Sequence, residues 1–366
     1  MRVLVVNAGS SSLKLRLLDG ADRVLEAAEE PAAGPGAVAE RLAEFLGNVG
    51  EVDAAGHRIV HGGARFTSSA VLTDAVAGEL RGLSDLAPLH NPPALAGVQA
   101  LRKLRPGLPE VACFDTAFHA TLPPAAATYA VPWAWTERHG IRRFGFHGLS
   151  HAYAARRAAD LLARPAGELR TVTCHLGAGA SLAAVAGGVS VDTTMGFTPL
   201  EGLVMATRPG SVDPGVLLYA QRHLGLAVDE LERVLDSESG LLGVSGVSSD
   251  VRAVLRAAEE GHERARLALA VYAHRLRAGI AAMAAAMGGL DALVFTGGVG
   301  EHQPPIREAA CEGLAFLGVA LDPVRNRAAA TDGDLSPPGA RARVLLVQAR
   351  EDLEIARETR RLLTAA

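Results

Sequence analysis

The hydrophobic pattern of the chain predicts two similar strand–loop–strand units that lie far apart in the sequence. The first has the apolar run Val3 to Val6, a polar loop, and an alternating stretch from Leu13 to Leu17. The second begins with a short buried strand predicted over Thr171 to His175, after which glycines let the chain turn back sharply. His175 stands where Asn7 stands in the first unit. Such a pair suggests an internal duplication, with one phosphate-binding loop in each domain.

The rest of the pattern mixes short apolar strands with longer helical stretches, which is typical of an α/β protein. Further strands are expected over 52–63, 111–115, 291–296 and 343–348, and helices over 40–46, 251–255, 262–286 and 351–364. Residues 20 to 50 are rich in alanine and glutamate and carry no motif. The segment from Ala87 to Pro93 is extended and enters a helix.

Size and composition restrict the classes of protein that the chain can belong to. Its 366 residues favour two domains, and 49% hydrophobic residues, 21% charged residues and a net charge of −4 indicate a soluble globular protein without an electrostatic case for nucleic acid. No stretch is long and uncharged enough to span a membrane, and the N-terminal apolar run stops at Asn7. Cys113, Cys174 and Cys311 are scattered, which fits free thiols in a reducing cytoplasm.

Both loops offer groups that bind phosphate. The first supplies hydroxyls at Ser10 and Ser12 and is followed by Lys14, although no Walker A motif occurs in the sequence. The glycine-rich loop 177–181 can turn several backbone N–H groups toward one anion. An ordinary glycine hairpin remains the alternative for this loop. A dehydrogenase is disfavoured, because the glycines do not extend to GxGxxG before a helix.

Four charged residues are candidates for chemistry, and each also has a purely structural explanation. Arg58 lies inside an apolar strand and needs a ligand or an ion-pair partner. Asp115 ends a strand, where α/β folds bind ligands, but could also cap a helix. Arg208 could reach out of its Pro-Gly loop or be an ordinary surface arginine, and Glu351 could be only a first-turn acid.

His147 and His151 are spaced four residues apart, as zinc ligands on one helix face can be. No glutamate follows His147 and no third ligand is evident in the sequence, so a zinc site is disfavoured.

Several of these segments together closely resemble the acetate kinase family. Gly196 to Leu203, with the Thr-Arg-x-Gly that follows, matches one signature of the family nearly letter for letter, and Asn7 to Lys14 resembles another. Six or seven ordered segments extend the resemblance over nearly the whole chain. It implies two duplicated ribonuclease H-like (actin-like ATPase) domains, with mixed sheets flanked by helices and a catalytic cleft between them. The implied domains are 1–120 plus 353–366, and 121–352.

The resemblance also implies roles for individual residues. It implies catalytic roles for Asp115, His147 and Arg208, and Mg²⁺ ligation by Asn7 and Glu351. The implied pocket for the substrate consists of Arg58, Val60, Leu89, Phe146 and Pro199. The implied nucleotide-binding residues are Ser10, Ser12, Lys14, His175, Leu176, Gly177, Ala178, Gly179, Asp250, Val251, Arg252, Gly298, Val299, Gly300, Glu301 and His302.

The implied activity is reversible, in-line phosphoryl transfer from ATP to acetate, with ADP as the other nucleotide and Mg²⁺, or Mn²⁺, as the metal. The resemblance further implies a cytoplasmic homodimer formed through the second domain. The chain departs from the family pattern at Ala178, His302 and Arg350, which replace amide side chains. These departures keep three alternatives open: a propionate or butyrate kinase, a pyrophosphate-using kinase, and a binding regulator without catalysis.

Overall fold

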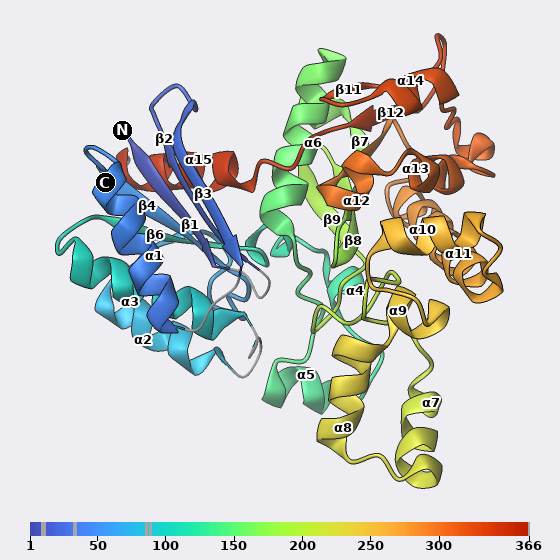
Figure 1. Ribbon diagram of the computed structural model, residues 1–366, viewed down its shortest axis with the longest axis horizontal. Coiled ribbons are helices and arrows are strands. Elements are labelled where there is room, and N and C mark those ends of the chain that lie inside the picture. The colour runs from blue at the N-terminus through green and yellow to red at the C-terminus, as the bar shows by residue number, and fades with distance from the viewer. Residues whose placement is uncertain (9–11, 32–34, 85–86, 88–89, 365–366) are drawn as a thin grey trace. The chain divides into compact units, whose positions relative to one another are not determined.

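The computed structural model describes residues 1–8, 12–31, 35–84, 87 and 90–364, and the chain forms two compact units (Figure 1). The first unit comprises 1–120, 146–153 and 350–366, and the second comprises 121–145 and 154–349. The segments 146–153 and 350–352, which the predicted domains assign to the second half, thus pack with the first unit.

The first unit is built on a mixed six-stranded sheet with the order β3-β2-β1-β4-β6-β5. Its strands are β1 (Val3–Ala8), β2 (Ser12–Leu18), β3 (Val24–Pro31), β4 (Ala54–Ile59), β5 (Ala70–Val71) and β6 (Glu110–Phe114). Strands β1, β4 and β6 are parallel, and the other pairings are antiparallel. Its main helices are α1 (Pro35–Asn48), α2 (Asp74–Gly82), α3 (Asn91–Leu104) and α15 (Glu351–Thr364).

Alternation along β1 sends side chains to two hydrophobic cores, one on each face of the sheet. Leu4 and Val6 pack with Leu42 of α1 and Leu101 of α3. Val3 and Val5 face the other way and pack with Ile355 and Ala356 of α15, the red helix beside these strands in Figure 1. The C-terminal helix is therefore part of the core of the N-terminal sheet.

The second unit repeats this plan with a sheet of order β11-β12-β10-β7-β8-β9. Its strands are β7 (Arg170–Leu176), β8 (Ala180–Ala186), β9 (Val189–Thr193), β10 (Ala292–Thr296), β11 (Gly333–Asp334) and β12 (Arg343–Leu346). As in the first sheet, three consecutive antiparallel strands, here β7, β8 and β9, are followed by parallel strands, here β10 and β12, that extend the sheet from β7. The matching order of antiparallel and parallel pairings confirms the predicted duplication.

Several helices belong wholly or partly to the second unit. They are α4 (Pro124–Ala127), α5 (Trp133–His139), α6 (Gly148–Leu162), which begins in the first unit, α7 (Pro214–Tyr219), α8 (Val228–Arg233), α9 (Gly240–Ser245), α10 (Val251–Glu259), α11 (Glu263–Ala286), α12 (Gly297–His302), α13 (Pro304–Cys311) and α14 (Pro323–Ala328). Among the described residues, no helix has both the length and the apolar character needed to cross a membrane.

Strand β3 is the main element that the sequence pattern does not reveal. It lies at the edge of its sheet, and most of its residues are exposed, including Val24 and Leu25. An exposed edge strand rich in glutamate and alanine lacks the apolar alternation on which the prediction depends.

Candidate active site

Three polar side chains lie in a row across the parallel strands of the first unit. The sheet register places Val6 opposite His57 and Arg58 opposite Cys113. One residue further along β1, Asn7 is level with Arg58, and Asp115 directly follows β6. Because side chains alternate between faces, these three point to the same face at the carboxyl ends of their strands.

Hydrogen bonds join this row to the start of α15. The Arg58 guanidinium forms a two-pronged pair with Asp115, from Nε to Oδ1 at 3.0 Å and from Nη2 to Oδ2 at 2.6 Å. Its Nη1 donates to Asn7 Oδ1 at 3.2 Å, and Asn7 Nδ2 donates to Glu351 Oε2 at 3.2 Å. Arg58 therefore does have a structural ion pair, and Asp115 is its partner rather than a helix cap.

Two carboxylates share the one buried cation of this cluster. Burial raises the pKa of Asp115, and this effect outweighs the opposing effects of Arg58 and of the hydrogen bond from the His147 main chain. Burial acts to lower the pKa of Arg58, but Asp115 and Glu351 more than reverse it. The cluster has more anionic than cationic groups, so an added cation would stabilise it electrostatically.

The main chain of His147 and Gly148 is fitted closely against Asp115. The Gly148 N–H donates to the Asp115 carbonyl oxygen at 2.9 Å, and a Cβ on Gly148 would lie only 2.0 Å from that oxygen. His147 adopts φ 56°, a conformation uncommon for residues other than glycine. Phe146 is buried, with its ring centroid 5.4 Å from that of His61. The segment is thus held in a constrained conformation beside the charged row.

The turn after β4 is held by two polar residues that the sequence analysis did not single out. Asn91, fully buried at the start of α3, accepts from the His61 N–H and donates to the His61 carbonyl, both at 3.1 Å. Thr116 Oγ1 accepts from the Gly62 N–H at 3.1 Å. The only sequence signal for Asn91 is its position beside two prolines in a segment that resembles the family. Val60, just before this turn, is buried.

In the second unit, the glycine-rich loop is tied to the loop that carries Arg208. The Gly177 N–H donates to the Gly179 carbonyl at 2.9 Å, and the Ala178 carbonyl accepts from the Ala206 N–H at 3.1 Å. Arg208 Nη1 donates to the Pro199 carbonyl at 2.8 Å. This arrangement brings Gly177, Ala178, Gly179, Pro199 and Arg208 into one neighbourhood.

Arg208 is partly buried in its loop. Burial lowers its pKa, and the nearby Asp236 opposes that shift. Gly240 (φ 62°) makes room for the loop, because a Cβ there would lie 2.3 Å from the Met205 carbonyl oxygen. A guanidinium with a weak local counter-charge is suited to meet a phosphate.

The start of α10 and the residue that follows α12 line one pocket of the second unit. Gly297 (φ 78°) lets the start of α12 approach β7, since a Cβ there would lie 2.7 Å from the Leu176 carbonyl oxygen. A pocket of 490 Å³ is lined by Asp250 and Arg252 from the start of α10 and by Gln303 from the end of α12. Its volume is within the range of ordinary small-molecule sites.

The remaining predicted site residues differ in how far their side chains are exposed. The side chains of Leu176 and Val251 are buried, so only their main chains are available to a ligand. Gly298 and His302 are exposed, and Val299 and Glu301 are half-buried; Gly300 is buried against the end of β7. His175 and Ser12 are half-buried, and Lys14 forms an ion pair with Glu29 at 3.1 Å. Ser10 and Leu89 lie outside the described residues.

The donor set of the first unit suits Mg²⁺. Asn7 and Glu351 carry side-chain oxygens, the type of ligand that Mg²⁺ prefers, and Mg²⁺ ordinarily uses few protein ligands and completes its coordination with water and phosphate. Within the described ranges, no group of three or more His, Cys, Asp or Glu side chains is arranged to hold a metal. His147 lies just before α6 and has a positive φ, whereas His151 lies on α6. The two histidines are therefore not placed one turn apart on a single helix, as in a helical zinc-binding motif.

The fold and these two groups of residues define a class of protein. A duplicated α/β fold with a glycine-rich loop beside an arginine loop in one unit and a partly buried arginine among carboxylates in the other is typical of a phosphotransferase with an anionic acceptor.

Comparison with known proteins identifies the family. Residues 22–357 match the model of the acetokinase family. An acetate kinase of Synechococcus sp. is 48% identical over 402 aligned residues, covering 99% of each chain. A crystal structure of the Porphyromonas gingivalis acetate kinase superposes with TM-score 0.91 at 39% identity and 99% coverage of both chains. A propionate kinase from Francisella tularensis gives TM-score 0.90 at 35% identity and 98% coverage of both chains. The chain belongs to the acetokinase family.

Proposed function

We propose that the protein transfers the γ-phosphoryl group of ATP to acetate, reversibly, giving acetyl phosphate and ADP. Membership of the acetokinase family and the full-length similarity to acetate kinases support this reaction. The observation that carries the proposal is Arg58, a partly buried guanidinium near the end of β4 whose position is fixed by Asp115 and Asn7.

Arg58 is the proposed ligand of the acetate carboxylate. Three of its five N–H groups are taken by Asp115 and Asn7 among the described residues, which leaves two for a bidentate carboxylate. The buried side chains of Val60 and Phe146 are proposed to contact the methyl group. Leu89 and Pro199 remain predicted members of the same pocket.

The second unit is proposed to bind the nucleotide. The 490 Å³ pocket, lined by Asp250, Arg252 and Gln303, would take the adenosine, and the adjacent segment 298–302 is proposed to contact it as well. The glycine-rich loop and His175 would contact the phosphates, and Arg208 would meet the charge on the transferred group.

The reaction needs no proton transfer. An acetate oxygen, already ionised at neutral pH, attacks the γ-phosphorus, and the bond to the bridging oxygen breaks with its electron pair leaving on ADP. Asp115 is therefore proposed to hold Arg58 in place rather than to act as a base. Mg²⁺, held through Asn7 and Glu351, would neutralise phosphate charge. His147, in its constrained conformation, would donate a hydrogen bond to the group in transfer.

Acyl hydroxamate formation from purified protein, ATP and Mg²⁺ tests the proposal. We expect turnover with acetate that is lost in Arg58→Gln and Arg208→Ala and retained in Arg138→Ala, which removes an exposed arginine of α5. EDTA should abolish the activity, and Mg²⁺ or Mn²⁺ should restore it. A folded protein that binds ATP but turns over no acid would overturn the proposal and favour a binding regulator.

The same assay separates the alternative substrates. The structural similarity to a propionate kinase makes propionate the alternative acid with specific support. A higher kcat/KM with propionate or butyrate than with acetate would assign the larger acid, and product formation from pyrophosphate in place of ATP would reassign the donor.

We further propose that the protein forms a homodimer through its second unit and acts in the cytoplasm. Exposed apolar side chains gather in and around α7 and α8, namely Val216, Leu218, Tyr219, Leu224 and Val228. Such a concentration of apolar surface is typical of a protein interface. Sedimentation equilibrium should give a dimer that Leu224→Glu converts to monomer, whereas the exposed, distant Glu26→Gln should not. The three buried free thiols suit a reducing compartment.

A further inference from the structure

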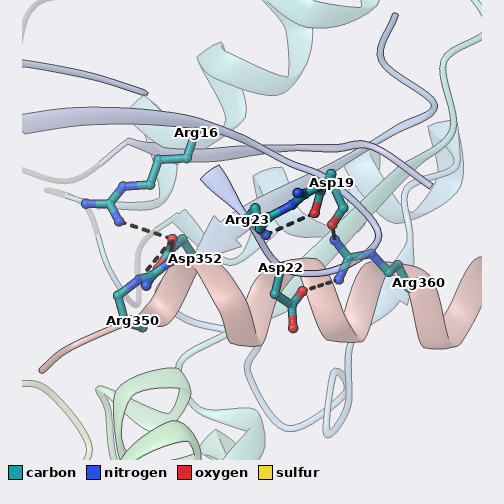
Figure 2. A network of polar contacts seen from close by, with 7 residues as sticks. All are labelled: Arg16, Asp19, Asp22, Arg23, Arg350, Asp352 and Arg360. Atoms are coloured by element: carbon teal, nitrogen blue, oxygen red, sulfur yellow. Dashed lines mark hydrogen bonds and ion pairs between the residues drawn. The ribbon is translucent and has the colours of Figure 1, made fainter. Parts of the chain in front are cut away.

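Two arginines clamp one carboxylate at the start of α15. Arg350 donates to both oxygens of Asp352, from Nε to Oδ1 at 3.0 Å and from Nη2 to Oδ2 at 2.9 Å. Arg16, from β2, donates from Nη1 to Asp352 Oδ2 at 3.1 Å (Figure 2). Asp352 is buried, whereas the two arginines are about one-third exposed. Neither Arg16 nor Asp352 is among the predicted site residues, and Arg350 stands where the family has an amide side chain.

The clamp lies directly beside the carboxylate row of the first unit. The register of β1 and β2 pairs Asn7 with Lys14 and Val5 with Arg16. Side chains two residues apart on a strand share a face, so Arg16 points to the same face of the sheet as Asn7. On α15, Asp352 follows Glu351, whose carboxylate accepts from Asn7. Helix α15 is thus bonded to two neighbouring strands, to β1 through Glu351 and to β2 through Asp352.

Without the contacts of Asp352, the first turn of α15 would lose its bond to β2, and the Glu351 carboxylate could move. Glu351 Oε2 lies 3.2 Å from Asn7 Nδ2 and 3.9 Å from Arg58 Nε. A rotation of the first helical turn would move this carboxylate relative to Asn7, the other proposed ligand of the metal. Arg16 and Arg350 also balance the charge of Asp352, which otherwise adds to the repulsion among the first-turn acids Glu351, Asp352 and Glu354.

We propose that Arg16 and Arg350 are positioning residues that act through Asp352 to hold Glu351 where it can ligate the divalent metal. This inference rests on the proposed function, because it takes Glu351 as a metal ligand. In this chain the arginine at position 350 then compensates for the amide that the family has there, by fixing the helix turn rather than by contacting phosphate.

The same helix carries a matched control. Arg360 also ties α15 to the β2–β3 hairpin, donating from Nη1 to Asp22 Oδ1 at 2.5 Å and from Nη2 to the Asp19 carbonyl at 2.6 Å (Figure 2). It lies roughly 13 Å further along the helix axis than Glu351. Removing Arg360 therefore weakens the attachment of α15 without releasing its first turn.

The test compares Arg16→Gln, Arg350→Gln and Arg360→Gln by Mn²⁺ binding in the presence of ADP, followed by electron paramagnetic resonance. The Mg²⁺ activation constant, the KM for acetate and the thermal midpoint are measured alongside. We expect the first two variants to weaken Mn²⁺ binding and raise the Mg²⁺ activation constant about tenfold, as loss of groups that orient metal ligands commonly does. The KM for acetate should change less than about twofold, and Arg350→Lys should recover part of the loss, because lysine restores charge but not the two-pronged bond.

Arg360→Gln should lower the thermal midpoint while leaving Mn²⁺ affinity unchanged. Equal weakening of Mn²⁺ binding in all three variants, in proportion to lost thermal stability, would overturn the inference and reduce the clamp to a helix anchor. Unchanged Mn²⁺ affinity in Arg16→Gln and Arg350→Gln would overturn it as well. Failure of the unaltered protein itself to bind Mn²⁺ with ADP, or to form hydroxamate, would instead count against the proposed function on which the inference rests.

Discussion

Gly148 shows how tightly single residues are constrained around the acceptor site. Its N–H bonds to the Asp115 carbonyl, and the space in which a side chain would begin is filled by that carbonyl and by Phe118. Beside it, His147 has a positive φ. At the residue scale, the conformation of the main chain here matters as much as the identity of the charged groups.

Gly148→Ala is expected to lower the free energy of unfolding by about 1–3 kcal/mol, because the new methyl group must displace the Asp115 main chain. Phosphoryl transfer should fall with it, since Asp115 holds Arg58. Urea unfolding and the hydroxamate assay measure both. Gly47→Ala, in α1 with open space around its Cβ, is the control and should be neutral or slightly stabilising. Equal behaviour of the two variants would contradict the argument.

His119 should make the stability of the protein depend on pH. Burial lowers its pKa to about 4, and its Nε2–H donates to the Phe146 carbonyl. In the unfolded chain its pKa is about 6.5, so between these values only the unfolded state binds the proton. The free energy of unfolding should therefore fall as the pH falls from about 6.5 to 4, by up to about 3 kcal/mol.

Urea unfolding of the unaltered protein and of His119→Gln across this pH range checks the expectation. The variant should be less stable at pH 7 but should lose less stability on acidification. If the two proteins lose stability in parallel, His119 is not the group responsible.

At the scale of elements, Arg307 joins three helices of the second unit. It is fully buried and donates to the carbonyls of Gly300 and Glu301 at the end of α12, and to the side chain and carbonyl of Asn326 on α14. Burial lowers its pKa. Because α12 carries most of the predicted adenosine segment, this buried network fixes the part of the main chain that nucleotide is proposed to contact.

Arg307→Met is expected to destabilise the protein by about 3 kcal/mol, since it leaves several buried carbonyls without donors. The affinity for ADP should fall several-fold because α12 loses its support. Denaturant unfolding and calorimetric titration with ADP measure the two effects. Arg327→Met, which removes an exposed arginine from α14, should change neither. Unaltered ADP affinity in a destabilised Arg307→Met protein would show that the network serves stability alone.

At the scale of the whole molecule, the chain divides into two compact units, and its last helix contributes to a core of the first unit. Chains with several compact units often unfold in more than one step. A ligand that binds one unit stabilises that unit by mass action, by about 2.7 kcal/mol at a hundredfold excess over its Kd.

Scanning calorimetry should accordingly resolve two thermal transitions. Saturating ADP is expected to raise the midpoint of one of them, assigned to the second unit, by about 5–10 °C and to leave the other nearly unchanged. Acetate should not move the transition that ADP moves. A single transition that shifts as a whole with either ligand would show instead that the two units unfold together.

Much of the fold could be predicted from the sequence because it depends on local patterns. The apolar runs predicted the strands on both sides of the two loops expected to bind phosphate. The helix from Glu351 to Thr364 was predicted at its full length. Strand β3 was missed, since an exposed edge strand carries little apolar alternation. The family, the duplication and the kinase class were likewise accessible, because they rest on motifs of contiguous residues.

What the sequence by itself determined is therefore the order of the elements, the family and the residues that are able to do the chemistry. Only the tertiary structure decided which of them interact. Asn7 forms a hydrogen bond with Glu351, 344 residues away in the sequence, and Arg58 forms one with Asp115. Asn91, Arg307 and the clamp on Asp352 were recognised in the same way. The reason is physical: a hydrogen bond or an ion pair depends on a few ångströms of distance, and distant segments reach that distance only when the sheets and helices have packed.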